Sequence, residues 1–444
     1  MHKTPFKKHK IYFLPKINFD KKIGLTLLIA IVGYVFHYLF NIELSHAFST
    51  ENYGEIQAIL SISVFLAHIL LLGNATASVK FIPEYIKTKN YSKLHGLVKY
   101  YSSHVIVAMI LAFFILLIFS FFIQNFTWNN FNFNFDTTWK YLWIAPIFAL
   151  FIFFYEILMS LNAPFSSLLS HKVFPKFLFL LSFEFFRFFF GTMSLKITIC
   201  LYSIILAFVI LGEVLKINQV VDKKIFTSHD IETDKSWFST SIRLMFAIIL
   251  IQNGTGIINL LLKLFGEDSA SSIAVLSIVQ VLTFCMWISY TACSDLLDSS
   301  IAPAAQAKNT TNLQSIINKG NCITFSFGLI IFCIFVFFGK TLLRHFGEFY
   351  VSGYVPLLIV AGGNLIGLAA GLSSNILEYA LNPKELLFLN LGGGIVIILV
   401  GSPLIYLYGL YGGAITFALI SAGLTIAYGV ALRKRLNLRA FSIF

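Results

Sequence analysis

Residues 58–66 read Ala58-Ile-Leu-Ser-Ile-Ser-Val-Phe-Leu66, and residues 274–282 read Ala274-Val-Leu-Ser-Ile-Val-Gln-Val-Leu282. The two stretches lie 216 positions apart (274 minus 58) and agree at five of nine positions. Each is part of a continuous apolar run of the length that a helix needs to cross a bilayer, about 20 residues. Neither shows the period-two alternation of lipid-facing strands. The pair therefore predicts two equivalent transmembrane helices in a helical membrane protein.

Similar apolar runs occur along the whole chain. The 444 residues are 58% hydrophobic and 12% charged, whereas soluble domains carry about 25% charged residues. The bilayer is therefore expected to be the solvent for most side chains. The runs predict twelve spans, at 23–42, 54–79, 103–124, 141–162, 173–192, 195–215, 242–262, 270–294, 321–339, 353–375, 385–408 and 410–432.

The longest polar connection, 217–240, separates six spans from six. Six spans per half give both halves the same orientation, as in transporters built from parallel repeats. We therefore predict an all-α polytopic fold with two pseudo-symmetric six-helix lobes around a central cavity. The predicted divisions are a basic N-terminal tail (1–22), an N-lobe (23–216), an inter-lobe loop (217–240), a C-lobe (241–432) and a basic C-terminal tail (433–444).

The basic residues predict the orientation of the chain. The net charge of +12 could suggest a nucleic-acid partner, but most of the 32 Lys and Arg residues fall in the two tails and in alternate loops. This asymmetry follows the positive-inside rule and predicts that both termini are cytoplasmic. The first apolar run is long and lacks a cleavage site, so we expect it to be retained. No nucleic-acid partner is expected.

Short motifs lie on either side of the second predicted span. Ser49-Thr-Glu-Asn-Tyr-Gly54 precedes it, and Lys80-Phe-Ile-Pro-Glu-Tyr85 follows it. Asn382-Pro-Lys-Glu385, Gly409-Leu-Tyr-Gly-Gly-Ala414 and Leu432-Arg-Lys-Arg435 lie near the C-terminus. Together these motifs resemble the Wzx-type polysaccharide flippases of the MATE-like MOP superfamily, and the resemblance extends over essentially the full chain.

The resemblance implies a function, a location and partners. Such proteins move undecaprenyl-pyrophosphate-linked oligosaccharides, units of O-antigen, capsule or other surface polysaccharides, across the bacterial inner membrane by alternating access. The implied partners are this substrate, membrane lipids, and the polysaccharide polymerase and chain-length machinery. No cofactor is implied. Lys80 stands where an arginine is more usual, and it offers a point charge in place of a bidentate fork for phosphate oxygens.

Ionisable groups inside a membrane are costly and usually face a cavity or a partner. Glu184 and Arg187, three residues apart on the fifth span, can pair on one helix face. This pair either only stabilises the helix, or Arg187 binds a pyrophosphate while Glu184 orients it. Glu156 on the fourth span stands alone among Phe and Leu. It either bonds a neighbouring helix or exchanges a proton near neutral pH.

Charges near the inner ends of two repeat-related spans suggest a gate. Asp295 and Asp298 of the eighth span occupy nearly the repeat positions of Lys80 and Glu84. We predict that Lys80 pairs with Asp295 or Asp298 to close the cytoplasmic side. The alternative is that these side chains only reach the lipid headgroups.

Polar residues at related depths suggest a sugar site. His37 matches Asn253 in the repeat (253 minus 216), next to Gln252. These groups either bind sugar hydroxyls in a central cavity or form hydrogen bonds between helices. Arg243, near the start of the seventh span, is a candidate headgroup anchor or phosphate contact.

Two other functions compete with this interpretation. A cation-coupled multidrug or small-molecule exporter of the same fold would need acids in its cavity. A membrane glycan polymerase or ligase would need charged outer loops, but the longest one, 125–140, carries one acid, Asp136. No nucleophile with a base, no metal-ligand cluster and no phosphate-binding loop is evident. We therefore expect a transporter without catalytic residues or a bound metal.

Overall fold

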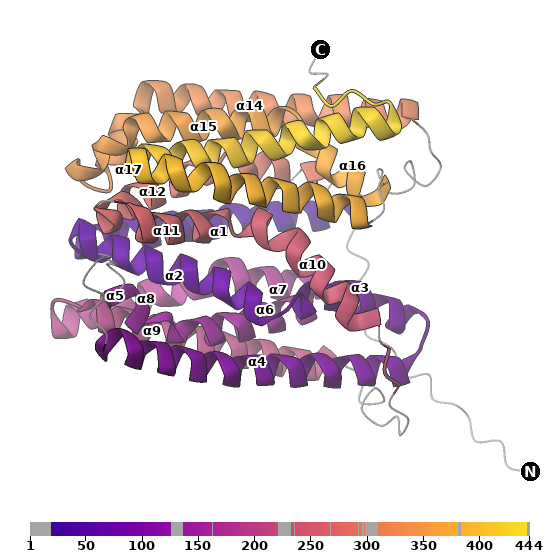
Figure 1. The fold of residues 1–444 in the computed structure, drawn as a ribbon, viewed down its shortest axis with the longest axis horizontal. Coiled ribbons are helices and arrows are strands. Elements are labelled where there is room, and N and C mark those ends of the chain that lie inside the picture. Colours follow the sequence, from indigo (N-terminus) through magenta and orange to yellow (C-terminus); the bar gives the residue numbers. More distant parts are fainter. Residues whose placement is uncertain are drawn as a thin grey trace, which may run out of the picture.

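The structure is a computed structural model. It describes residues 19–125, 136–161, 163–220, 232–234, 236–266, 268–291, 293–294, 297, 310–380 and 383–441. Over these residues the chain is helical and contains no strand. Figure 1 shows the helices lying roughly parallel, in two groups that follow the order of the chain. The predicted all-α fold is confirmed.

The first group, here called the N-lobe, contains helices up to residue 220. Its elements are α1 Phe19–Ala47, α2 Thr50–Leu70, α3 Asn74–Lys87, α4 Tyr91–Asn125, α5 Asp136–Lys140, η1 Leu142–Ile144, α6 Ala145–Ser160, α7 Pro164–Leu168, η2 Leu169–Val173, α8 Phe174–Phe190 and α9 Leu195–Val220.

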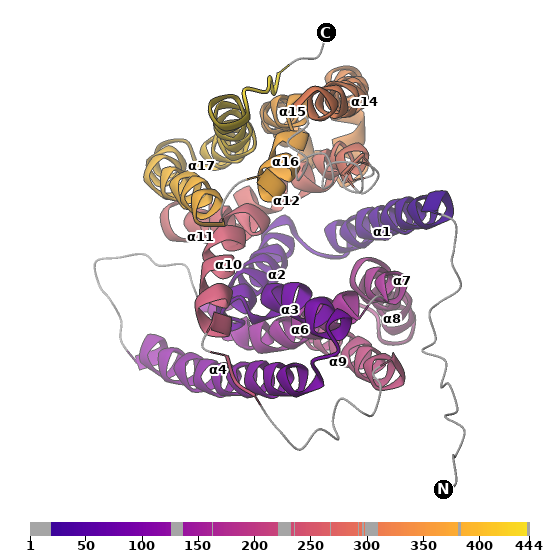
Figure 2. The same ribbon diagram turned by 90° about the vertical axis from the view of Figure 1, so that its right-hand side faces the viewer.

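The second group, the C-lobe, follows residue 236. Its elements are α10 Ser236–Gln252, α11 Gly254–Phe265, α12 Ser269–Phe284, α14 Thr310–Arg344, η4 Glu348–Gly353, α15 Tyr354–Ala369, α16 Leu372–Ala380 and α17 Pro383–Leu436. Figure 2 shows the C-lobe above the N-lobe, with α2 and α10 between them.

The helices of the described residues are roughly consistent with the predicted twelve spans. Eight described helical segments are long and apolar enough to cross a membrane. One of them lies in α17, which holds two spans because its backbone turns sharply at Gly409 (φ 50°, ψ −118°). The other spans are α8, α12 and the pair α10 and α11, which are shorter or broken. The 17 residues of α8 extend about 26 Å, and because α7 and η2 precede α8 without a gap, the helical run from Pro164 to Phe190 is long enough to cross a bilayer.

Several spans that the sequence predicts as single helices are broken. The second span, predicted at 54–79, ends as α2 at Leu70 and resumes as α3 at Asn74. Between them Leu72 and Gly73 have positive φ values of 49° and 74°, a region that glycine adopts at little cost. A Cβ at residue 73 would also lie 2.0 Å from the carbonyl oxygen of Ser241, so this break lets α10 approach closely.

The break supports the predicted repeat. In the C-lobe the corresponding helix, α12, ends at Phe284, and a turn at residues 285–286 follows. Subtracting the repeat offset of 216 from 285 gives 69, next to the end of α2. The seventh span is broken at Asn253, whereas α1 runs unbroken through the equivalent His37. The two halves are therefore similar at their second helices and differ at their first.

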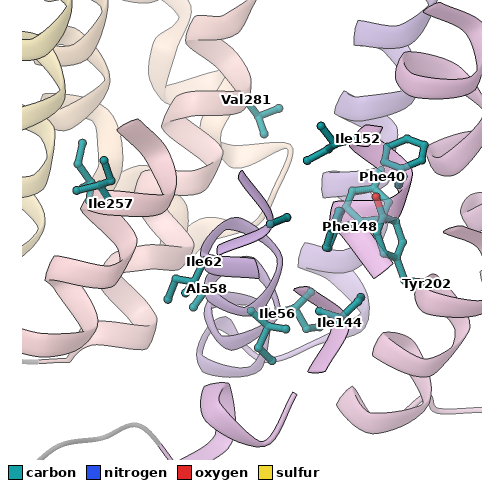
Figure 3. Close-up of a cluster of buried hydrophobic side chains, with 14 of the residues drawn as sticks. Phe40, Ile56, Ala58, Ile62, Ile144, Phe148, Ile152, Tyr202, Ile257 and Val281 are labelled. Atoms are coloured by element: carbon teal, nitrogen blue, oxygen red, sulfur yellow. The ribbon is translucent and has the colours of Figure 1, made fainter. Parts of the chain in front are cut away.

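The packed core is continuous between the lobes. Phe40, Phe148 and Tyr202 bring α1, α6 and α9 together, with ring centroids 5.9 Å and 6.1 Å apart. Ile56, Ala58 and Ile62 of α2 are buried, as are Ile257 of α11 and Val281 of α12. Figure 3 shows α2 between these two sets of side chains. The helix that carries the repeat motif thus forms the centre of the contact between the lobes.

Candidate functional site

A group of basic side chains lies where α1 meets η2 and α8. Here called the basic cluster, it contains His37 of α1, His171 and Lys172 of η2, and Lys176 of α8. The backbone brings these elements close, because a Cβ at Gly33 would lie 2.9 Å from the Cβ of Lys172. Ring contacts support the same arrangement, with Phe36 of α1 5.2 Å from Phe177 of α8.

Lys176 lies at the centre of the basic cluster. It is near enough to His37 and to His171 to act on both electrostatically. No described carboxylate forms an ion pair with Lys176. Helices α7, η2 and α8 follow one another without a gap, and Lys176 lies 12 residues after Pro164 and 14 residues before Phe190, which corresponds to about 18 Å and 21 Å along this helical run. The charge therefore lies well inside the span, where an unpaired cation is costly unless an anion approaches it.

His171 is fixed by aromatic rings. It stacks on Tyr155 and Phe151 of α6, with centroids 4.3 Å and 5.2 Å away. Its Nδ1 is buried and has no hydrogen-bond partner among the described residues. The rings hold the imidazole in one orientation and leave a polar atom for a ligand or a water molecule.

His37 connects the basic cluster to the C-lobe. Its ring lies 6.5 Å from the ring of Phe284, at the end of α12. Asn41, one turn further along α1, donates to the His37 carbonyl oxygen at 2.7 Å and accepts from Tyr53 and Gln57 of α2 at 2.8 Å and 2.9 Å. The interhelical hydrogen bonds in this region are thus made by Asn41, and His37 lies beside them at the boundary between the lobes.

Two carboxylates lie next to the basic cluster, near Tyr155, the ring that stacks on His171. Glu213 of α9 is buried and accepts a 2.6 Å hydrogen bond from Ser170. Its second oxygen has no partner among the described residues. Glu156 of α6 lines a small cavity with His68, Thr76, Met245 and other residues of α2, α3, α6 and α10. The cavity has a volume of about 10 Å³, which is close to the space that one water molecule needs.

Arg187 forms the ion pair that the sequence predicts and one more. Its guanidinium lies 3.2 Å from Glu184 and 3.1 Å from Glu43 of α1. All three side chains are partly exposed. The two carboxylates leave this group with a net charge of −1, which does not favour a phosphate. Its role in pyrophosphate binding stays a prediction, and the observed contacts tie α8 to α1.

The other predicted site residues are dispersed. Lys80 and Glu84 are exposed on α3, and the Lys80 ammonium lies 5.6 Å from the centre of the Phe81 ring. Asp295 and Asp298, the proposed gate partners, lie outside the described residues. Arg243 donates to the carbonyl and hydroxyl oxygens of Ser239, on its own helix, at 2.8 Å and 3.1 Å.

The polar pair on the seventh span lies at the break of that helix. Gln252 is the last residue of α10, and Asn253 precedes α11. Asn253 is buried, and its Nδ2 has no partner among the described residues. Among the described residues no hydrogen bond joins Asn253 to His37, although the two occupy equivalent repeat positions.

The lobes are joined at the end of the molecule opposite the start of α1 and the end of α17. Here called the lobe seal, this contact contains Gly54, Glu55, Thr138, Lys263 and Ala270. Lys263 of α11 forms an ion pair with Glu55 of α2, and its side chain is 1% exposed. The second Glu55 oxygen accepts a 2.6 Å hydrogen bond from Thr138. If either partner of such a deeply buried pair is removed, the other charge stays buried without a counter-charge, which is strongly destabilising.

Further contacts surround the lobe seal. Asn259 of α11 donates to Ser61 of α2 at 2.8 Å. The rings of Tyr53 and Tyr350 meet edge to face at 6.0 Å, and His46 lies 2.9 Å from the carbonyl oxygen of His345. All of these contacts join an N-lobe helix to a C-lobe element, so this end is closed in the structure.

Gly54 permits the closest approach of α2 to α12 in the lobe seal. A Cβ at this position would lie 1.8 Å from the carbonyl oxygen of Ala270, so even alanine cannot fit without separating α2 from α12. We expect Gly54→Ala to shift the protein toward a conformation open at this end, detected as faster labelling of a cysteine placed nearby. Gly212→Ala is the control, since a Cβ there has no neighbour within 4 Å. Equal labelling of the two variants would contradict the expectation.

Sequence reasoning misses the two principal features of the site. The positive-inside pattern assigns Lys176 to an inner loop with Lys172, whereas the structure places Lys176 near the middle of the continuous helical run formed by α7, η2 and α8. The same pattern assigns Lys263 to an outer loop, whereas it is buried against Glu55. The sequence does contain a signal for the Glu55–Lys263 ion pair, because these two opposite charges lie at the predicted outer ends of their spans.

Comparison with known proteins identifies the fold. No family model matches the chain, and no curated protein matches it. Among solved structures, it is similar to an inward-facing multidrug resistance MATE family transporter of the MOP superfamily (TM-score 0.72, 13% identity, 94% of this chain and 98% of that chain).

Two further structures extend the comparison. The MATE multidrug transporter DinF-BH, solved as a complex, has a TM-score of 0.67 and 16% identity, with 100% of both chains covered. The lipid II flippase MurJ, in an inward closed conformation, has a TM-score of 0.65 and 16% identity, covering 93% of this chain and 89% of that chain. Identities this low establish the architecture alone. The chain is therefore a multi-pass membrane protein with the fold of the MATE and MurJ transporters.

Proposed function

We propose that this protein moves an anionic lipid-linked oligosaccharide, carried on undecaprenyl pyrophosphate, across the bacterial inner membrane by alternating access. The observation that carries the proposal is Lys176, a cation inside the span beside His37 and His171, with no ion pair to a described carboxylate. A pyrophosphate supplies the compensating charge that such a group requires. Charge-assisted hydrogen bonds from Lys and His to phosphate oxygens are short and strong.

The position of the basic cluster suits a substrate that passes between the lobes. His37 lies beside Phe284 of the C-lobe, so a headgroup held by Lys176 would lie at the boundary where the lobes separate. The lobe seal is then the outer gate, in agreement with the positive-inside pattern, which predicts that both termini are cytoplasmic. An inside-negative potential favours outward movement of an anion by about 2.3 kcal/mol per charge per 100 mV.

Gene deletion tests the proposed substrate. Deleting the gene in its source organism is expected to remove a surface polysaccharide and to accumulate its lipid-linked intermediate on the inner side, both restored by the wild-type gene. Extraction of lipid-linked glycans and analysis of surface glycan provide the measurements. Unchanged glycans and intermediates would rule out a polysaccharide substrate.

A cation-coupled exporter of small molecules is the second candidate. It is favoured by the carboxylates Glu156 and Glu213 inside the N-lobe, because buried acids can carry protons or cations. The two functions differ in a direct assay. An exporter would give resistance to cationic dyes that is lost in Glu213→Gln, whereas the flippase would leave dye resistance unchanged on gene deletion.

A further inference from the structure

A groove lies on the C-lobe between the two arms of α17. It is lined by residues of both arms, has a volume of about 490 Å³, and lies apart from the basic cluster and the lobe seal. Volumes of 300–1,000 Å³ are typical of small-molecule sites. The lining includes Glu385, Phe388, Val430, Ala431, Lys434 and Arg435.

The lining divides into an apolar floor and a charged rim. Phe388 is 72% exposed and Val430 48% exposed, so the floor faces the surroundings of the helix bundle, which for a membrane protein are lipid chains. The rim lies at the first turn of one arm and the last turn of the other. The groove therefore combines acyl-chain surface with charge at the depth where helices leave the bilayer.

The charge of the rim selects one class of lipid. Arg435 pairs with Glu385 at 2.7 Å, and Lys434 has no ion pair with a described carboxylate. Two cations and one carboxylate leave a net charge of +1, which a phosphodiester headgroup with one negative charge balances and a zwitterionic headgroup does not. Basic pockets between transmembrane helices are a recognised way to hold anionic lipid headgroups.

We propose that this groove binds one anionic glycerophospholipid of the surrounding bilayer. Its phosphate contacts Lys434 and Arg435, and one acyl chain lies along Phe388, Val430 and Ala431. Glu385 holds the Arg435 guanidinium in place by their ion pair. The proposal does not depend on what the protein transports, because none of these residues belongs to the basic cluster or to the lobe seal.

Lipid retention by the purified full-length protein tests this proposal. The protein is exchanged into detergent with equal amounts of phosphatidylglycerol and phosphatidylcholine, and bound lipid is counted by native mass spectrometry. The wild type is expected to retain one phosphatidylglycerol in preference to phosphatidylcholine. Lys434→Gln is expected to lower this retention about fivefold, the factor that one lysine contact with an anionic surface contributes.

Two further variants make the test specific. Ala431→Phe fills the groove without changing charge and should also lower retention. Arg344→Gln is the control for Lys434→Gln, since Arg344 is likewise an exposed basic residue at the end of a helix but does not line the groove. Equal retention by all variants, or a wild type that retains an added polyprenyl phosphate in place of phosphatidylglycerol, would overturn the proposal.

Discussion

Replacing Lys176 with alanine is expected to reduce binding of a pyrophosphate-linked lipid by a factor of about 30 to several thousand. Truncating one partner of a buried charge pair costs about 2 to 5 kcal/mol, and each 1.4 kcal/mol is a factor of ten. Lys176→Arg keeps the charge and should retain most of the binding. The measurement is the affinity of the purified protein for undecaprenyl pyrophosphate, supported by complementation of the deletion strain.

Two variants control this experiment. Lys319→Ala removes an exposed lysine of α14 and should bind as the wild type does. Arg187→Ala tests the anion site predicted from the sequence, and the two carboxylates beside Arg187 lead us to expect only a small loss. If Arg187→Ala loses binding while Lys176→Ala keeps it, the pyrophosphate lies at the far end of α8 and the basic cluster is not its site.

Neutralising Glu55 is expected to open the lobe seal. In Glu55→Gln the ammonium of Lys263, which is 1% exposed, would remain buried without a counter-charge. Breaking a buried pair in this way costs about 3 to 5 kcal/mol, which corresponds to a shift by a factor of about 10² to several thousand in the equilibrium between closed and open conformations. Lys263→Gln should shift the same equilibrium in the same direction.

Distances across the lobe seal report this shift. Spin labels at Glu51 of α2 and Glu348 of η4, both exposed, are introduced after replacing the five native cysteines. Each single variant should populate longer distances, and the charge-swapped Glu55→Lys, Lys263→Glu protein should return toward the wild-type distribution. Unchanged distances in both single variants would show that the pair does not hold the gate.

Much of the fold could be predicted because apolar length directly reports membrane crossing. The break at Leu72 and Gly73 was not predicted, because the apolar run continues through it and the need for positive φ arises from the approach of α10.

The candidate site was predictable only in part. The pairing of Glu184 with Arg187 depends on a spacing of three residues within one helix, which a sequence displays directly. The contact of Glu43 with Arg187 joins residues 144 positions apart, and the ion pair of Glu55 with Lys263 joins residues 208 positions apart. Such contacts depend on how helices pack, and hydropathy carries no information on which helix faces which.

The sequence by itself determined that this chain is a helical membrane protein with about twelve spans and an internal repeat. Tertiary structure decided what the charged residues do. Packing of α1 against η2 and α8 places Lys176 beside His37 and His171, and packing of α2 against α11 and α12 buries Lys263 against Glu55. The physical reason is that crossing a bilayer depends on local composition, whereas the environment of a charge depends on neighbours that are distant in the chain.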